Sequence, residues 1–134
     1  MKTETVNIKV KGLKRLINKY LWRMDVEQPT ISLTPNALVF LYNSRKEYTT
    51  IPWTEITEFK FIKDDLGTGI IPILKNPQLY IDACTSKVIK FGMQHGMKQD
   101  GSPFNIRVDN LDYSPDEIAT LVEEYQKENG AAAE

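Results

Sequence analysis

Apolar and polar residues alternate or recur at helical spacing along much of the chain, and this pattern predicts its elements. Residues 5–11 alternate, which is typical of a short half-buried strand. In residues 13–24 the apolar positions follow the i, i+3, i+4, i+7 spacing of one helix face, and many of the remaining positions are basic. The N-terminal segment 1–28 is therefore predicted to be a strand followed by a basic amphipathic helix.

Short β-rich runs follow, separated by turn residues. We expect strands at 30–34, 37–43, 47–51, 56–63, 70–74 and 104–108. The polar, glycine-containing stretch 64–69 is predicted to be a loop. Short strands at roughly even spacing favour an antiparallel sheet that closes into a sandwich or barrel.

Residues 77–95 leave two structures open. Asn76-Pro77 is a good helix start, and apolar residues at helical spacing follow it, whereas residues 87–91 alone can also form a strand. We favour a short helix or helical pair through about His95. A polar loop over 96–103 is then expected before the last strand.

The chain ends on a clear helix signal. Ser114, Pro115 and Glu117 occupy the N-cap, N1 and N3 positions of a capping box. An apolar stripe follows, and Gly130 is suited to the end of the helix. We therefore place one domain at 29–130, closed by this helix, and a frayed tail at 131–134. Such a helix can cover the open corner between two orthogonal sheets.

Four segments in order resemble a known family. The run Ile51-Pro52-Trp53-Thr54-Glu55-Ile56 resembles the I-x-W-x-D/E-I signature of bacterial pleckstrin-homology-like (PH-like) domains, between their third and fourth strands. Residues 70–81, 101–106 and 114–125 resemble the later parts of one small subfamily, in the same order. The resemblance covers about residues 29–128.

This resemblance implies an α+β, mainly β fold. It comprises PH-like orthogonal antiparallel sheets of about six or seven strands, a C-terminal capping helix and a helical insertion before the last strand. Members often carry transmembrane helices before the domain, where this chain has the basic helix 13–24 instead. The fold is a binding platform without implied catalytic residues. Its structural signature falls on Trp53, Ile56, Pro77, Pro103, Ser114 and Glu117.

Composition and charge narrow the function classes. The 134 residues suit one globular domain, and a single cysteine and a single histidine argue against disulfides and a structural zinc site. Residues 1–24 hold seven basic residues and one acidic residue, whereas residues 109–134 hold one and eight. The sequence pI near 5.9 and the lack of basic strands with interleaved aromatics argue against nucleic-acid binding.

Few residues offer reaction chemistry. Cys84 and His95 would be a nucleophile and a base, but no third group completes them, so we interpret them as a buried cysteine and a loop histidine. Asp64-Asp65 is interpreted as a solvated turn, because a hard cation needs more oxygen ligands. We expect no catalytic, cofactor-binding or metal-binding residue, and hence a protein that is not an enzyme.

Two functions of different class remain. The first is a cytoplasmic module that recruits a protein partner, with the apolar stripe of helix 13–24 docked on its own domain. The second is peripheral attachment of this helix to an anionic membrane, which attracts each nearby Lys or Arg by about 1 kcal/mol. An exposed sheet edge can also pair two copies into a homodimer. The candidate partner or membrane surface consists of Lys14, Arg15, Lys19, Trp22 and Arg23.

One specific lipid ligand is not expected. Phosphoinositide recognition in related folds uses basic residues in the loop between the first two strands. In the predicted domain this loop is 34–36, which has no Lys or Arg.

Overall fold

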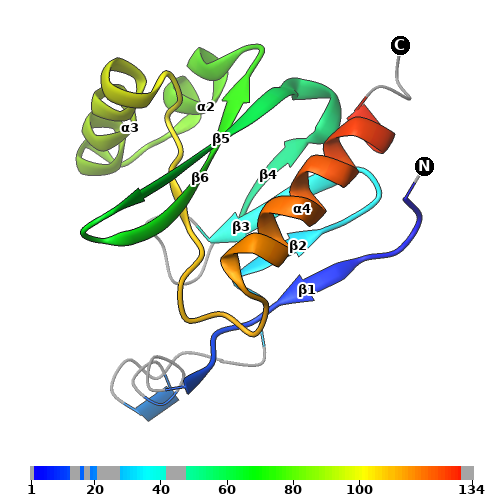
Figure 1. Cartoon of the computed structure of the whole chain (residues 1–134). Coiled ribbons are helices and arrows are strands. Elements are labelled where there is room, and N and C mark those ends of the chain that lie inside the picture. The colour runs from blue at the N-terminus through cyan, green and yellow to red at the C-terminus, as the bar shows by residue number, and fades with distance from the viewer. Residues whose placement is uncertain (1, 13–15, 17–18, 21–27, 42–47, 131–134) are drawn as a thin grey trace.

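The computed structural model describes residues 2–12, 16, 19–20, 28–41 and 48–130 (Figure 1). These residues form two antiparallel sheets, one of four strands and one of three, together with α-helices. The strands are β1 (Val6–Ile8), β2 (Ile31–Leu33), β3 (Ala37–Leu41), β4 (Tyr48–Pro52), β5 (Ile56–Asp64), β6 (Gly67–Leu74) and β7 (Ile106–Arg107). The helices are α2 (Pro77–Ala83), α3 (Lys87–Asp100) and α4 (Pro115–Tyr125), with the short η1 (Trp53–Glu55) and η2 (Gln126–Gly130). The predicted α+β class with a C-terminal helix is confirmed.

The four-stranded sheet follows the order of the chain, β1-β2-β3-β4. Its register aligns apolar residues, so that Ile31 of β2 lies opposite Ile8 of β1 and Phe40 of β3. β1 belongs to the predicted segment 1–28, yet it pairs with a strand of the predicted domain 29–130. The first two strands of this sheet are therefore β1 and β2, and the connection between them lies before the predicted domain strands. The uncharged loop at 34–36 joins β2 to β3 instead, so the expectation about phosphoinositides rested on the wrong loop.

The second sheet has the order β5-β6-β7, and its hairpin corrects a prediction. Residues 64–69 do not form a loop: β5 and β6 are joined by the two-residue turn Asp65-Leu66. Gly67 already belongs to β6 and has a φ of +116°. A Cβ at this position would lie within 2.0 Å of the Asp109 side chain. The glycine accommodates this close approach within a strand.

Residues 77–100 form a helical pair, as favoured from the sequence, but the second helix is longer than predicted. α3 continues beyond His95 to Asp100 and ends at Gly101, which has a left-handed φ of 78°. Most of the predicted loop 96–103 is therefore helical. Gly96 is retained inside the helix because the Ser102 carbonyl oxygen would lie 2.8 Å from a Cβ there. The last strand is also shorter than predicted, since β7 comprises only two residues.

The predicted capping box is present at the start of α4. The Ser114 hydroxyl accepts a hydrogen bond from the Glu117 N–H at 3.1 Å, and the Glu117 carboxylate accepts one from the Ser114 N–H at 3.0 Å. The hydrogen bond from the Ser114 backbone N–H to the carboxylate is the main cause that lowers the pKa of Glu117 below its ordinary value, and the Ser114 side chain adds to it. The α-helix ends at Tyr125, and the π-helical turn η2 continues to Gly130. The predicted tail 131–134 lies outside the described residues.

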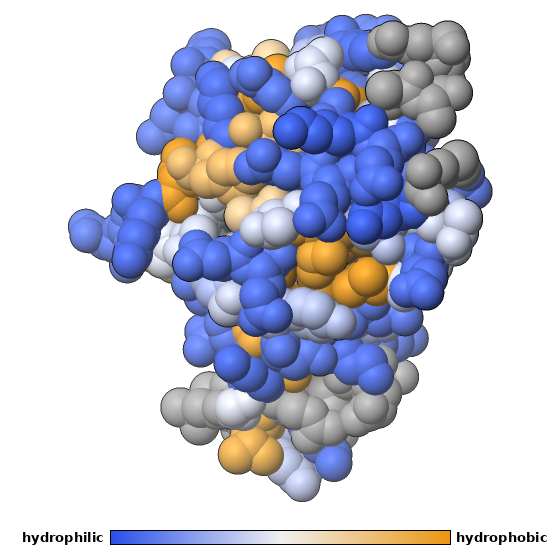
Figure 2. All heavy atoms as spheres, turned by 45° about the vertical axis from the view of Figure 1, so that its right-hand side comes forward, coloured by the Kyte–Doolittle hydropathy of each residue, from blue (hydrophilic) through white to orange (hydrophobic). Residues whose placement is uncertain are grey.

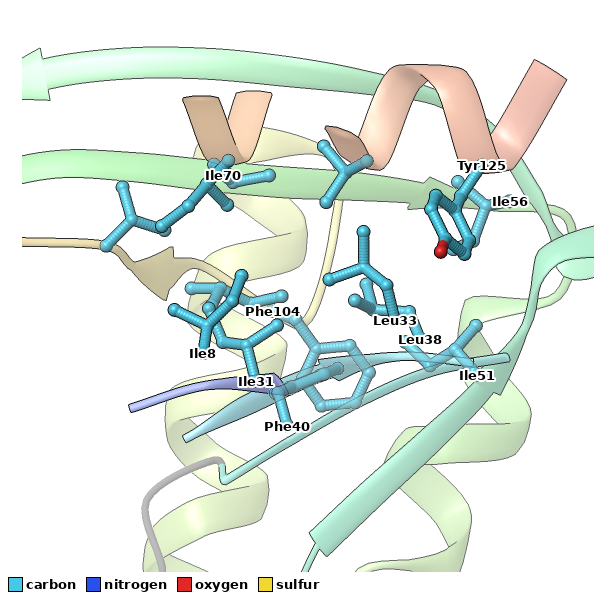
Figure 3. Packing of buried hydrophobic residues seen from close by; sticks show 14 of the residues in the cluster. Ile8, Ile31, Leu33, Leu38, Phe40, Ile51, Ile56, Ile70, Phe104 and Tyr125 are labelled. Atoms are coloured by element: carbon cyan, nitrogen blue, oxygen red, sulfur yellow. The ribbon is translucent and has the colours of Figure 1, made fainter. Parts of the chain in front are cut away.

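One apolar core lies between the sheets, where Ile8, Ile31 and Phe40 of the first sheet face Ile70 of the second (Figure 3). The Phe104 ring meets the Phe40 ring edge-on at 5.3 Å. α4 adds the buried residues Ile118, Val122 and Tyr125. The described strands stay in two separate sheets, so the alternative of a closed barrel is wrong. α4 covers the corner beside β5, where a closing strand would have to lie.

Candidate functional site

The basic surface predicted at residues 13–24 lies largely outside the described residues. This applies to Lys14, Arg15, Trp22 and Arg23. Lys19 is described and exposed, and its ammonium nitrogen lies 5.4 Å from the centroid of the Tyr20 ring.

Two residues of the predicted apolar stripe in this segment are also described. Leu16 is 51% exposed and Tyr20 is 67% exposed. If the apolar stripe docked on its own domain, as predicted, these two side chains would be buried. Leu16 and Tyr20 are exposed instead, so the structure does not show this docking at either position.

The residues of the structural signature occupy framework positions. Trp53 is 1% exposed, donates its indole N–H to the Thr34 carbonyl at 2.7 Å, and has its ring centroid 5.6 Å from that of Tyr125. Ile56 and Pro103 are buried. Pro77 starts α2, and Ser114 and Glu117 cap α4.

The two residues considered for catalysis, Cys84 and His95, lie at the end of α2 and within α3. Cys84 follows the end of α2, and its thiol lies 3.6 Å from the Ser86 carbonyl oxygen. His95 is exposed on α3 and does not lie in a loop, because the helix continues past Gly96. In the described part of the chain, no group of three or more His, Cys, Asp or Glu side chains could hold a metal ion.

Asp64 also has a structural role. Its carboxylate accepts hydrogen bonds from the Arg107 guanidinium at 2.9 and 3.0 Å, and another from the Leu66 N–H at 2.9 Å. The hydrogen bond from Arg107 is the main cause of a lowered pKa at Asp64. These contacts tie the tip of the β5–β6 hairpin to β7.

The best candidate for a binding site is the outer edge of β5. With nine residues β5 is the longest strand described, and it stands at one end of the three-stranded sheet. α4 runs beside it in the opposite direction. The start of α4, at Pro115 and Asp116, lies near Phe61 and Lys63 at the far end of β5. At the other end, the Gln126 side chain donates to the Ile56 carbonyl at 3.0 Å.

The hydrogen-bond pattern shows which backbone groups of β5 point outward. Thr68 lies opposite Lys63, but its N–H donates to Asp109 and its carbonyl accepts from Val108, on the β7 side. Lys63 and Thr68 are therefore a pair without mutual hydrogen bonds, and in an antiparallel ladder such pairs recur at every second residue. Outward-pointing N–H and C=O groups thus belong to Phe59, Phe61 and Lys63.

Among the residues that the structure describes, these outward groups have no backbone partner. The side chain of Gln126 covers the carbonyls of Ile56 and Thr57 at the start of β5. Beyond Thr57, none of the residues that the structure describes donates to or accepts from the outer edge. The free stretch at residues 59–63 is long enough to pair with a short added strand.

The side chains around this edge form a shallow groove, which we call the β5–α4 groove. A hollow of about 370 Å³ lies at one end, between Phe61, Ile62 and Pro115, and a second of about 380 Å³ lies at the other, beside Ile56 and Gln126. Phe61 is 41% exposed, and its ring stacks on that of Phe59 at 6.5 Å. The face that carries α4 is mostly hydrophilic, with small apolar patches between (Figure 2).

The groove was not among the predicted sites. The alternation that places Phe59 and Phe61 on one face of a strand is visible in the sequence, but the position of that strand at a sheet edge is not. None of the described helices has the length and apolar character needed to cross a bilayer. Searches against protein-family models, curated proteins and solved structures find no match for this chain.

Proposed function

We propose that this protein is a non-enzymatic, PH-like binding module that captures an extended segment of a partner protein along β5. The order of the elements supports the PH-like part of the proposal. A four-stranded antiparallel sheet is followed by a three-stranded sheet, with a helical pair before the last strand and a closing helix at the C-terminal end.

The observation that carries the binding function is the free edge of β5. An extended peptide that adds to a sheet edge gains main-chain hydrogen bonds, and pockets beside the edge select its side chains. Phe59, Phe61 and Lys63 offer these backbone groups, and the hollow beside Phe61 can hold an apolar side chain. Lys60 and Lys63 are exposed on the strand, and lysines on an edge discourage indiscriminate pairing.

Amide hydrogen exchange tests the proposal residue by residue. In the free protein, the amides of Lys60 and Ile62 should exchange slowly because they bond to β6, whereas those of Phe59, Phe61 and Lys63 should exchange fast. Peptides selected from a random displayed library against the purified protein should slow the exchange of the second group. Protection of that group without peptide, in a dimer detected by ultracentrifugation, would mean that the edge pairs two copies instead.

A matched pair of variants tests the side-chain part. Phe61→Ser removes the aromatic wall of the groove and should weaken the selected peptides about tenfold or more. Phe91→Ser removes an exposed phenylalanine of α3, outside the lining of the groove, and should leave the affinity unchanged. Equal affinities for both variants, measured by fluorescence anisotropy, would refute binding along β5.

A second candidate, attachment to an anionic membrane through residues 13–24, is supported by the exposure of Leu16, Lys19 and Tyr20. These residues lie in the connection between β1 and β2. A chain in which Lys14, Arg15, Lys19 and Arg23 are replaced by Gln should bind phosphatidylserine vesicles more weakly than the wild type at low salt. Unchanged co-sedimentation would exclude this segment as the attachment site.

A further inference from the structure

α3 has an outward face that combines apolar and basic residues. At about 100° per residue, five residues fall within an arc of about 100°. They are Lys87, Val88, Phe91, His95 and Lys98, which we call the α3 outer face. Val88 is 83% exposed and Phe91 is 73% exposed, so two large apolar side chains stand in solvent.

The opposite side of α3 fixes the orientation of this face. Met93 is buried in the core, and Ile89 and Met97 pack against it. Asp100 is the sole acidic residue of α3 and lies about 180° around the helix from Phe91. The α3 outer face therefore has no carboxylate of its own helix to neutralise Lys87 and Lys98.

We infer that the α3 outer face binds an anionic lipid surface, independently of the β5–α4 groove. Projecting apolar side chains can enter the boundary between headgroups and acyl chains, while neighbouring lysines attract lipid phosphates and carboxylates. Such a fluid layer needs no matching shape, which suits Val88 and Phe91 on a convex helix.

The distribution of charge favours the same occupant. Residues 109–134 hold eight of the acidic residues of the chain, and they include α4. α4 lies on one side of the molecule, and α3 lies on the other (Figure 1). When α3 faces an anionic surface, the acidic residues of α4 therefore point away from that surface and are not repelled by it.

Vesicle co-sedimentation of the full chain tests the inference. Vesicles of phosphatidylcholine with about 30% phosphatidylserine should bind the wild type at low salt. Replacing Lys87 and Lys98 by Gln should raise the apparent Kd roughly 30-fold, at about fivefold per charge. Phe91→Ser should raise it about tenfold. Lys11→Gln with Lys127→Gln removes two exposed charges elsewhere and is the matched control, as is Phe61→Ser in the groove.

A second measurement locates the contact itself. A Phe91→Trp variant should gain fluorescence that brominated lipid quenches, beyond the quenching of the wild type. Absence of this quenching, or wild-type affinity in both α3 variants, would overturn the inference and place any membrane contact elsewhere. Failure of the wild type to bind anionic vesicles would also overturn it and leave an acidic protein as the occupant of this face. Far-ultraviolet circular dichroism checks that each variant is folded.

Discussion

Asn129 joins the beginning and the end of the described chain, and replacing it by Ala should have a large effect on stability. Its side chain is buried and makes three hydrogen bonds. Its Oδ1 accepts from the Lys2 N–H at 2.8 Å, and its Nδ2 donates to the carbonyls of Lys2 at 3.0 Å and Pro35 at 2.8 Å. At about 0.5–1.5 kcal/mol for each bond, Asn129→Ala should lower the free energy of unfolding by roughly 2–4 kcal/mol.

A chain that begins at Thr5 separates these contributions. It lacks Lys2, so two of the three bonds are absent and Asn129→Ala should then cost only about 1 kcal/mol. The bond from the Tyr125 hydroxyl to the Glu4 carbonyl is lost in both shortened chains and cancels. Urea unfolding of the four chains gives a double-mutant cycle, with an expected coupling energy of about 2 kcal/mol. An equal cost of Asn129→Ala in both backgrounds would refute this link between the ends.

Three further predictions concern single positions in α3 and α4. Gly92→Ala should stabilise the protein by about 0.5–1 kcal/mol because a Cβ there would meet nothing within 4 Å. Gly96→Ala should destabilise the protein because its Cβ would lie 2.8 Å from the Ser102 carbonyl oxygen. If both variants unfolded at a higher temperature than the wild type, the close contact at Gly96 would be contradicted. Ser114→Ala should cost about 1 kcal/mol in chemical denaturation through loss of the cap, and no loss would contradict a stabilising role for that cap. The pKa of Glu117 is lowered in the folded protein, mainly by the Ser114 backbone N–H, so its contribution is present above the unfolded pKa of about 4.3 and is lost as pH falls through the folded value. The stability difference between the wild type and Glu117→Gln should accordingly shrink between about pH 7 and pH 3, and a constant difference would argue against this linkage.

Sequence patterns over a few residues were sufficient to predict those elements that are stabilised by near neighbours in the chain. The capping box at Ser114 depends on neighbours three residues apart, and the structure confirms it. Two of the errors arose at glycines, which local rules interpret as breaks in structure. Gly67 lies inside β6 because Asp109 approaches it closely, and Gly96 lies inside α3 because the Ser102 carbonyl does. Asp109 lies far from Gly67 along the chain, so no short window of sequence contains that contact.

The candidate site was less accessible to prediction than the fold. The sequence indicates that Phe59 and Phe61 share one face of a strand. It does not indicate that β5 ends a sheet, because that property depends on the pairing of β6 with β7 across the helical insertion. The exposed face of α3 was hidden for a related reason. The period of its apolar residues shows a helix, but only burial separates Met93 in the core from Phe91 in solvent.

The position of β1 has a consequence for folding during synthesis. β1 precedes the other described strands in the chain, and β2 provides a partner for it early. The residues on either side of β1 are held by a much later part of the chain: Val10 bridges to Leu111, and Lys2 bonds to Asn129. Contacts of such large sequence separation form slowly. On the ribosome the outer side of β1 therefore stays unpaired until residues 111–129 have emerged, and the apolar residues that α4 covers stay accessible to chaperones until then.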